Sequence, residues 1–582
     1  MICYCFKILR TLGIAVLFFC CLFQASGAEP AVEITPLAGD WVLPTQQSSQ
    51  FFRITNDSDQ AHTVTIELNR ISFFTKFPAP EKLLRTMEIP PRSTTIVALG
   101  GMTETPMDWK LNVQIDRETL PKQQIEELNK KFREIAAYGS EYSLKICLSQ
   151  QIPGNTGTFP ASVNDSRHES AQVSYFSATR SAQDYFSTAA QFYDASLLIM
   201  KSTEFQMLKE STRTELLRAI AMGLPVVFIG VPPEIPGIDW QKDSLNPNIQ
   251  YGYRHFGKVF AIPTTPEQWS ENEWDDFLEM ARLKDKGKNI RRYVEANTQT
   301  TPNAKMPPIL LLLAFMIFFF LVVGPINYFY LKKKNSICLL VLTVPILSIV
   351  LTLFNTVFLQ LWEGTKLEIT TDSVTFLDQL NHEATTLGTI GFYSPTRKSD
   401  LAFRDDVLLV MNKDFNISDI TIDTSSGFRI NGNYLQSRKK AILSQASSRY
   451  RPEELKVTEI TPGSTMEIVN GLGSKIHFLA VRDSEGNLYK STASIDPGQR
   501  ATLQFTDTEN EYTIFQHLSE FAQQNWKKFS FTLNSLGPNM YSAQLESSPF
   551  LETGSDVKPI EENVQIIGIY APPAVKEATN EN

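Results

Sequence analysis

The chain has 582 residues, of which 42% are hydrophobic and 20% charged, and its formal net charge is −9. This length is several times that of a typical domain, so several domains are expected. The high apolar content excludes a disordered or collagen-like polymer, and the acidic balance argues against a nucleic-acid-binding protein that works through bulk positive charge.

Residues 1–28 have the layout of a secretory signal peptide. Lys7 and Arg10 precede an apolar run at 12–23, and small and polar residues follow. As a helix rising about 1.5 Å per residue, the run spans about 18 Å, well short of the roughly 30 Å hydrocarbon core. We therefore predict cleavage after Gly27 or Ala28 and export of the chain that follows, rather than retention of a stable anchor.

Residues 29–118 are predicted to form a β-sandwich. Alternating apolar and polar residues occur at 51–55, 63–68 and 94–99, and turn residues separate these short runs. This spacing is typical of antiparallel strands in two packed sheets.

Residues 119–285 are predicted to form an α/β domain with a parallel sheet. Strands are expected at 142–149 and, as a pair, at 251–262. A helix is expected at the start of the domain, where one face carries the apolar residues Ile125, Leu128, Phe132, Ile135 and Ala136. The clearest pattern is 194–230, where an apolar strand, an amphipathic stretch ending near Gly223 and a second apolar strand follow one another. Such a pattern predicts a βαβ unit.

The carboxyl ends of the two strands in this βαβ unit form a candidate ligand site. Ligands of open parallel sheets bind where strands end. The residues expected there are Lys201, Ser202, Thr203, Glu204 and Gly230. The alternative is structural, with a hydroxyl capping the helix and a solvated lysine in the loop.

A membrane hairpin is predicted after a stalk at 286–308. Residues 309–331 and 337–361 are apolar and uncharged, and each is long enough to cross a bilayer. The turn at 332–336 is so short that the two helices must be antiparallel neighbours. Since the amino terminus is expected to be exported, the turn is predicted to be cytoplasmic, and the segments on both sides of the hairpin are predicted to be periplasmic or extracellular.

Several residues characterise the hairpin. Its turn is basic, and its spans hold helix-breaking or polar residues that need a neighbouring helix to satisfy freed backbone groups. The spans contain no ionisable side chain, which favours an anchor over a transport pathway. The residues singled out are Gly324, Pro325, Asn327, Tyr328, Lys332, Lys333, Lys334 and Pro345.

Residues 362–572 are predicted to form a C-terminal β-rich, sandwich-like domain, and 573–582 a disordered tail. Strands are expected at 367–371, 389–393, 407–411, 466–470, 475–481 and 501–505. The turn at 483–487 predicts a hairpin, and a helix is expected near 512–526. The whole chain is thus expected to be a multi-domain α+β membrane protein.

Motifs for catalysis or metal binding are weak. The six histidines are scattered without metal-ligand spacing, so neither a metal nor a cofactor is predicted. Residues 423–427 fail the aspartic-protease and metal-adhesion patterns, and the Ser437–Lys440 spacing lacks the companion motifs of penicillin-binding enzymes. Cys147 lies in an apolar run typical of mid-strand, where buried packing is favoured over a nucleophile.

The order of these parts resembles a group of uncharacterised bacterial inner-membrane proteins. The resemblance rests on the motif Gly-Pro-x-Asn-Tyr at 324–328, the basic turn, the proline in the second span and Ser-Pro-Phe at 548–550. In such proteins an N-terminal β-sandwich precedes an α/β domain that is similar to class I glutamine amidotransferases. The nucleophilic Cys of those enzymes and its His and Glu partners have no counterparts here, so the resemblance implies a binding or scaffold role without catalytic residues.

Three functional hypotheses remain open. The first is a non-enzymatic envelope protein of the bacterial inner membrane that presents two exported modules to protein or glycan partners, with the lipid bilayer as a further partner and no nucleic acid. The second is a periplasmic ligand sensor that uses the α/β crevice. The third is a hydrolase or transferase whose active site the sequence does not reveal.

Overall fold

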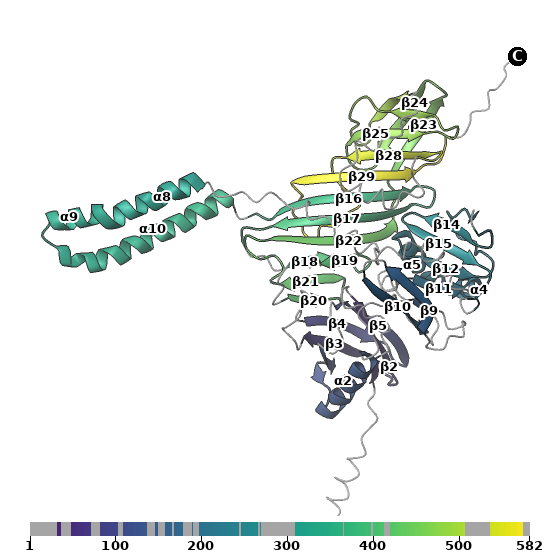
Figure 1. Cartoon of the computed structure of the whole chain (residues 1–582), viewed down its shortest axis with the longest axis horizontal. Coiled ribbons are helices and arrows are strands. Elements are labelled where there is room, and N and C mark those ends of the chain that lie inside the picture. Colours follow the sequence, from purple (N-terminus) through teal and green to yellow (C-terminus); the bar gives the residue numbers. More distant parts are fainter. Residues whose placement is uncertain are drawn as a thin grey trace, which may run out of the picture.

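The computed structural model is a mixed α+β fold dominated by sheets, with a helical hairpin that projects away from them (Figure 1). It describes residues 32–36, 48–70, 82–102, 109–136, 146–148, 158–165, 168–177, 189, 197–243, 246–265, 268, 309–364, 366–396, 400–411, 420–506 and 536–573. The predicted signal peptide, the stalk, the helix near 512–526 and nearly all of the tail lie outside these residues.

The first part of the chain forms two sheets that pack around one core, as a β-sandwich does. One sheet has the order β1-β2-β5, and the other contains β4-β3-β6-β7. Phe52 and Ile54 of the first sheet and Val64 and Val113 of the second are all fully buried in the shared core. The strands are β1 (Val32–Pro36), β2 (Ser48–Asn56), β3 (His62–Arg70), β4 (Lys82–Ile89), β5 (Ser93–Met102), β6 (Trp109–Ile115) and β7 (Glu118–Thr119).

Helix α2 (Lys122–Ala136) belongs to this sandwich by packing, although the sequence places it at the start of the α/β segment. The Phe132 ring stacks on Phe52 with centroids 6.3 Å apart. The Asn129 amide bonds the Leu111 backbone in both directions, accepting from its N–H and donating to its carbonyl at 2.8 Å each. The buried Asn129 side chain therefore hydrogen-bonds the β6 backbone as a neighbouring strand would, and it fixes the helix to the sheet.

Strands from beyond the hairpin complete the second sheet of the sandwich. Strand β20 (Ile420–Asp423) pairs in parallel with β4, with Ile422 opposite Leu83. Strands β21 (Phe428–Gly432) and β18 (Leu401–Phe403) follow, which gives the order β18-β21-β20-β4-β3-β6-β7. The two segments predicted at 29–118 and 362–572 thus share one sheet and one core. Periodicity cannot show this, because it reports the face of a strand and not its partner.

The α/β lobe is an eight-stranded sheet with the order β13-β14-β15-β12-β11-β8-β10-β9. Its central strands are parallel, and the edge strands β9, β13 and β14 are antiparallel to their neighbours. The strands are β8 (Ile146–Leu148), β9 (Thr158–Asp165), β10 (His168–Ser177), β11 (Leu197–Lys201), β12 (Val226–Ile229), β13 (Gln241–Lys242), β14 (Gln250–Arg254) and β15 (Gly257–Ile262).

The predicted βαβ unit is confirmed, with one difference. Strands β11 and β12 are parallel neighbours, and all four β12 residues are buried. The crossover is two helices, α4 (Ser202–Met207) and α5 (Glu210–Ala221), because buried Leu208 has an extended ψ of 143°. Gly223 follows the second helix with φ +111° and donates to the Ile220 carbonyl, as expected of a glycine helix stop.

The rest of the chain builds an eleven-stranded sheet with the order β19-β22-β17-β16-β29-β28-β25-β26-β27-β24-β23. All the strands predicted after the hairpin are present, and the 483–487 turn joins β25 to β26. The strands are β16 (Glu368–Asp378), β17 (Glu383–Tyr393), β19 (Leu408–Met411), β22 (Lys440–Tyr450), β23 (Glu454–Thr461), β24 (Thr465–Gly471), β25 (Ile476–Arg482), β26 (Leu488–Lys490), β27 (Arg500–Phe505), β28 (Met540–Leu545) and β29 (Glu561–Ile569).

This long sheet is covered on both faces around β17, the third strand of its order. Every residue of β17 is buried. On one side, Leu387 and Ala446 share a core with Leu216 and Ile220 of α5. On the other, Ile390 belongs to the sandwich core. Figure 1 accordingly shows the α/β lobe, the sandwich and the long sheet as one body.

The hairpin consists of α8 (Ile309–Leu321), a π-helical turn (Val322–Ile326), α9 (Asn327–Lys333), a 3₁₀ turn (Ile337–Leu339) and α10 (Leu340–Glu363). Within it, 313–333 and 337–358 are long and apolar enough to cross a membrane. Almost none of their surface is buried in the protein: Val341 is 84% exposed and Phe354 60%. Exposed apolar helices of this length are suited to a hydrocarbon environment.

Candidate functional site

The predicted crevice residues do lie together at the ends of β11 and β12. Lys201 pairs with Ile229 in the parallel ladder. The Ser202 hydroxyl, which is buried, donates to the Ile229 carbonyl at 3.2 Å, and the Gly230 N–H donates to the Ile262 carbonyl at 2.8 Å. The Ser202 hydroxyl thus ties the two strand ends together.

The other two crevice residues differ in exposure. Thr203 is exposed, whereas the Glu204 carboxylate is buried with the residue only 6% exposed. Gly230 has φ +107°, a conformation that side-chain-bearing residues rarely adopt. Ser202 does not cap α4, since no side chain caps this helix. A ligand role for these five residues stays a prediction.

The hairpin residues are held by contacts between the two helices. The Asn327 amide donates to the Thr343 hydroxyl at 3.0 Å, and this hydroxyl lies 3.3 Å from Asn327 Oδ1. Gly324 and Pro325 fall in the π-helical turn, and Pro345 lies inside α10. A proline frees a backbone carbonyl, and Pro325 coincides with the local irregularity of the first helix, whereas α10 continues through Pro345.

The end of the hairpin is basic and aromatic. The Lys332 ammonium lies 5.9 Å from the Tyr328 ring centroid, and the Lys334 ammonium lies 4.9 Å from that of Tyr330. Lys333 is exposed beside them. Tyrosine and lysine together are typical of the level at which a helix leaves the hydrocarbon core.

A buried polar cluster joins the α/β lobe to the long sheet, and sequence reasoning missed it. The two-residue turn between β14 and β15 inserts His255 against β16 and β17. The preceding Arg254 guanidinium forms an ion pair with Glu383 and also donates to the Pro236 carbonyl at 2.6 Å. The Arg254 and Glu383 side chains are 9% and 12% exposed.

His255 is the most enclosed member of this junction cluster. Its side chain is 4% exposed, and its ring stacks on Phe376 with centroids 4.8 Å apart. Nδ1 lies 2.7 Å from the Thr385 hydroxyl, and Nε2 lies 3.7 Å from Asp378 Oδ2. The residue has φ +49°, in the left-handed region that histidine adopts more often than most side-chain-bearing residues.

Asp378 is ionised in this environment. Burial opposes its charge, but the neighbouring His255 ring and the hydrogen bonds from the Asn381 side chain and backbone outweigh that effect and lower the pKa of Asp378 to about 2. The Asn381 amide donates to Oδ2 at 2.7 Å. The junction cluster thus sets two carboxylates of the β16–β17 hairpin against the side chains of the β14–β15 turn.

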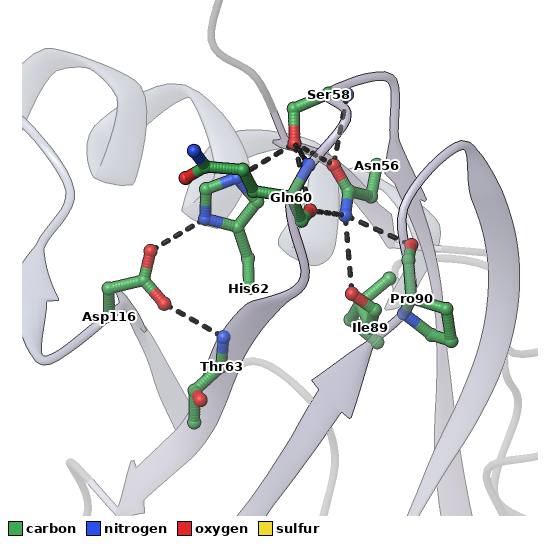
Figure 2. A network of polar contacts seen from close by, with 8 residues as sticks. All are labelled: Asn56, Ser58, Gln60, His62, Thr63, Ile89, Pro90 and Asp116. Atoms are coloured by element: carbon green, nitrogen blue, oxygen red, sulfur yellow. Dashed lines mark hydrogen bonds and ion pairs between the residues drawn. The ribbon is translucent and has the colours of Figure 1, made fainter.

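A second polar network joins three loops at one end of the sandwich (Figure 2). His62 Nδ1 lies 2.6 Å from Asp116 Oδ2, and His62 Nε2 lies 2.9 Å from the Ser58 hydroxyl. The fully buried Asn56 donates to the Gln60, Ile89 and Pro90 carbonyls at 2.8, 3.2 and 3.0 Å. The network therefore fixes the β2–β3 loop to the β4–β5 and β6–β7 loops.

The Ser-His-Asp order of this network has the connectivity of a hydrolytic triad, but the serine hydroxyl is also hydrogen-bonded within its own turn. Besides His62, the Ser58 oxygen contacts Asn56 Oδ1 at 2.8 Å, the Gln60 carbonyl at 2.9 Å and the Gln60 N–H at 3.2 Å. A hydroxyl has one proton and two lone pairs. The single proton can serve only one acceptor at a time, and three of the four contacts lie within the turn itself, so the arrangement holds the loop in place.

The weak catalytic motifs also have structural partners. Ser425 of the 423–427 loop accepts a hydrogen bond from the Thr86 N–H at 2.8 Å, next to the β4–β20 pairing. The Ser437 hydroxyl donates to the Pro395 carbonyl. Cys147 lies in mid-strand on β8, between β10 and β11, as predicted. Among the described residues, no group of three His, Cys, Asp or Glu side chains could hold a metal ion.

Comparisons with known proteins give no family. No protein-family model and no curated protein matches the chain. Among solved structures, the yeast delta-COP-I mu-homology domain covers 35% of this chain and 94% of its own length, at 7% identity and a TM-score of 0.18. The same domain complexed with a Dsl1 WxWxV peptide gives 8% identity and the same TM-score of 0.18.

A third solved structure, a mutant M1 zinc metallopeptidase from Deinococcus radiodurans, is 12% identical with a TM-score of 0.11, and the match covers 25% of this chain and 39% of that one. Similarities this slight carry no argument about fold or function.

Proposed function

We propose that this chain is a non-enzymatic membrane protein of the bacterial cell envelope. Its two-helix hairpin anchors it in the inner membrane, and an exported body made of the sandwich, the α/β lobe and the long sheet binds protein or glycan partners. The resemblance to inner-membrane proteins with a non-catalytic amidotransferase-like domain agrees with this assignment.

The observation that carries the proposal is the parallel pairing of β4 with β20. These strands lie on opposite sides of the hairpin in sequence, yet Leu83 and Ile422 face each other in one sheet and are both buried. A sheet cannot be continuous across a bilayer, so both ends of the hairpin must open on one side of the membrane. Two full crossings with a short turn satisfy that condition.

The connection between anchor and body supports a fixed presentation rather than a free tether. Helix α10 ends at Glu363 and β16, an interior strand of the long sheet, begins at Glu368. Gly364 between them has φ +78°, which turns the chain sharply. A connection of so few residues limits how far the body can move from the membrane surface.

The polar clusters of the described residues favour binding over catalysis. Ser58 is committed within its own turn, Ser202 ties β11 to β12, and the junction cluster is enclosed between the α/β lobe and the long sheet. Each set of groups that resembles an active site is thus used to hold two elements together.

The proposal is tested by purifying the full chain in mild detergent and identifying what accompanies it by mass spectrometry. A reproducible envelope protein or glycan supports a binding role, whereas a monomer that carries a small molecule in the α/β lobe contradicts it. The control is Leu83→Asp, which places a charge in the shared core and leaves the hairpin sequence intact. A partner of the exported body is lost in this variant, and a partner held by the hairpin alone remains.

A further inference from the structure

The hydrogen-bond directions in the junction cluster determine where the protons are. Glu383 pairs with Arg254, so its carboxylate is ionised and only accepts. The Ser448 hydroxyl donates to Glu383 Oε1 at 2.7 Å. Ser448 has then used its proton, so the 2.9 Å bond between Ser448 and Thr385 must be donated by Thr385.

The same reasoning extends to His255. Since Thr385 donates to Ser448, its oxygen accepts the 2.7 Å bond from His255, and Nδ1 must carry a hydrogen. In a neutral ring, Nε2 would then carry no hydrogen and act only as an acceptor. Yet Nε2 is buried, has no hydrogen-bond partner among the described residues, and faces the ionised Asp378 carboxylate at 3.7 Å. Two acceptors in that position would repel each other, whereas an N–H at Nε2 would be attracted.

We propose that His255 is an imidazolium in the assembled protein and that its protonation latches the α/β lobe onto the long sheet. The β14–β15 hairpin contributes two cations, Arg254 and His255, and the β16–β17 hairpin contributes two anions, Asp378 and Glu383. The charges of this latch are matched, which is the condition under which buried charges are tolerated.

The surroundings of His255 contain the groups that respond to its charge. Asp378 faces it from β16, and Arg254 precedes it on its own hairpin. Glu383 is linked to it by a chain of hydrogen bonds through the hydroxyls of Ser448 on β22 and Thr385 on β17. Phe376 covers one face of the ring. Asp378 stays ionised between pH 6 and pH 9. The latch therefore holds when His255 is protonated and weakens as rising pH removes that proton.

The direct test is histidine NMR on the full chain in mild detergent. The chain has six histidines, so selective ring labelling gives few signals, and loss of a signal in His255→Gln assigns it. We expect this ring to have both nitrogens protonated at pH 6, and Asp378→Asn to convert it to a neutral ring at the same pH. A neutral His255 ring in the wild-type protein at pH 6 would overturn the proposal. If His255→Gln does not fold, substituting the other five histidines one at a time assigns the same signal by elimination.

Hydrogen exchange then tests the effect on docking. After correction for intrinsic rates, peptides covering 250–262 and 376–386 should exchange at least tenfold faster at pH 9 than at pH 6. His255→Gln should remove this pH dependence. His382→Gln is the matched control, because His382 is exposed in the neighbouring β16–β17 turn and should behave as wild type. Exchange that does not change with pH, or that loses its pH dependence in His382→Gln, would contradict the latch.

Discussion

The substitution Ile422→Ala should destabilise a region that lies far before it in the sequence. Ile422 is fully buried on β20, opposite Leu83 of β4, in the core shared with β3 and β6. Removing the outer carbons of a buried isoleucine costs about 2–5 kcal/mol, through lost burial and the cavity left behind. A loss of 2 kcal/mol corresponds to about a 30-fold change in the folded-to-unfolded ratio.

The assay is hydrogen exchange of peptides covering 62–70 and 109–115, which lie on β3 and β6. In Ile422→Ala these amides should lose protection by at least about 30-fold, because they belong to the same cooperative sheet. The matched control is Ile468→Ala, since Ile468 is fully buried on β24 but in a separate core. This control should cost a similar free energy and leave the β3 amides unchanged. Unchanged β3 protection in Ile422→Ala would refute the shared sheet.

Three further predictions concern the loop network and the hairpin. The hydrogen bond from His62 lowers the pKa of Asp116, so the stability this pair contributes is complete above the unfolded value near 3.8 and is lost as pH falls through the lower folded value. The difference in melting temperature between wild type and Asp116→Asn should therefore shrink from pH 6 to pH 3, whereas the exposed Asp57→Asn should show no such trend. Replacing Lys332, Lys333 and Lys334 by Gln should weaken the preference for vesicles containing phosphatidylglycerol over neutral vesicles by about fivefold per lysine at low salt, measured by flotation. A double-mutant cycle of Asn327→Leu with Thr343→Val, measured by unfolding in detergent, should give a coupling of about 0.6 kcal/mol and no more than about 1.7 kcal/mol; zero coupling would mean that their hydrogen bond contributes nothing.

Local features of this fold were predictable from sequence because local periodicity and glycine placement set them. The βαβ unit at 194–230, the mid-strand position of Cys147 and the hairpin turn at 483–487 all follow from patterns within a short window. The break at Leu208 was not predicted, since the helical spacing of apolar residues continues through it.

The shared sheet and the junction cluster could not be predicted, because both depend on pairing between distant segments. No feature of residues 82–89 identifies 420–423 as their pairing partner, since many strands have the same alternation of apolar and polar residues. Arg254 and His255 look like ordinary turn residues until the fold encloses them. The one available signal was two ionisable residues placed directly between two apolar strands, where solvent exposure is the usual expectation.

The central claim is that the chain before and after the hairpin lies in one compartment, opposite the turn. Its most direct measurement is labelling of single-cysteine variants in intact cells with a membrane-impermeant thiol reagent. Asp57→Cys and Asp556→Cys, on the two sides of the hairpin, should both be labelled from outside the inner membrane once the outer barrier is permeable, and Lys333→Cys only after lysis. Labelling of Asp57→Cys and Asp556→Cys from opposite sides of the membrane would contradict the account.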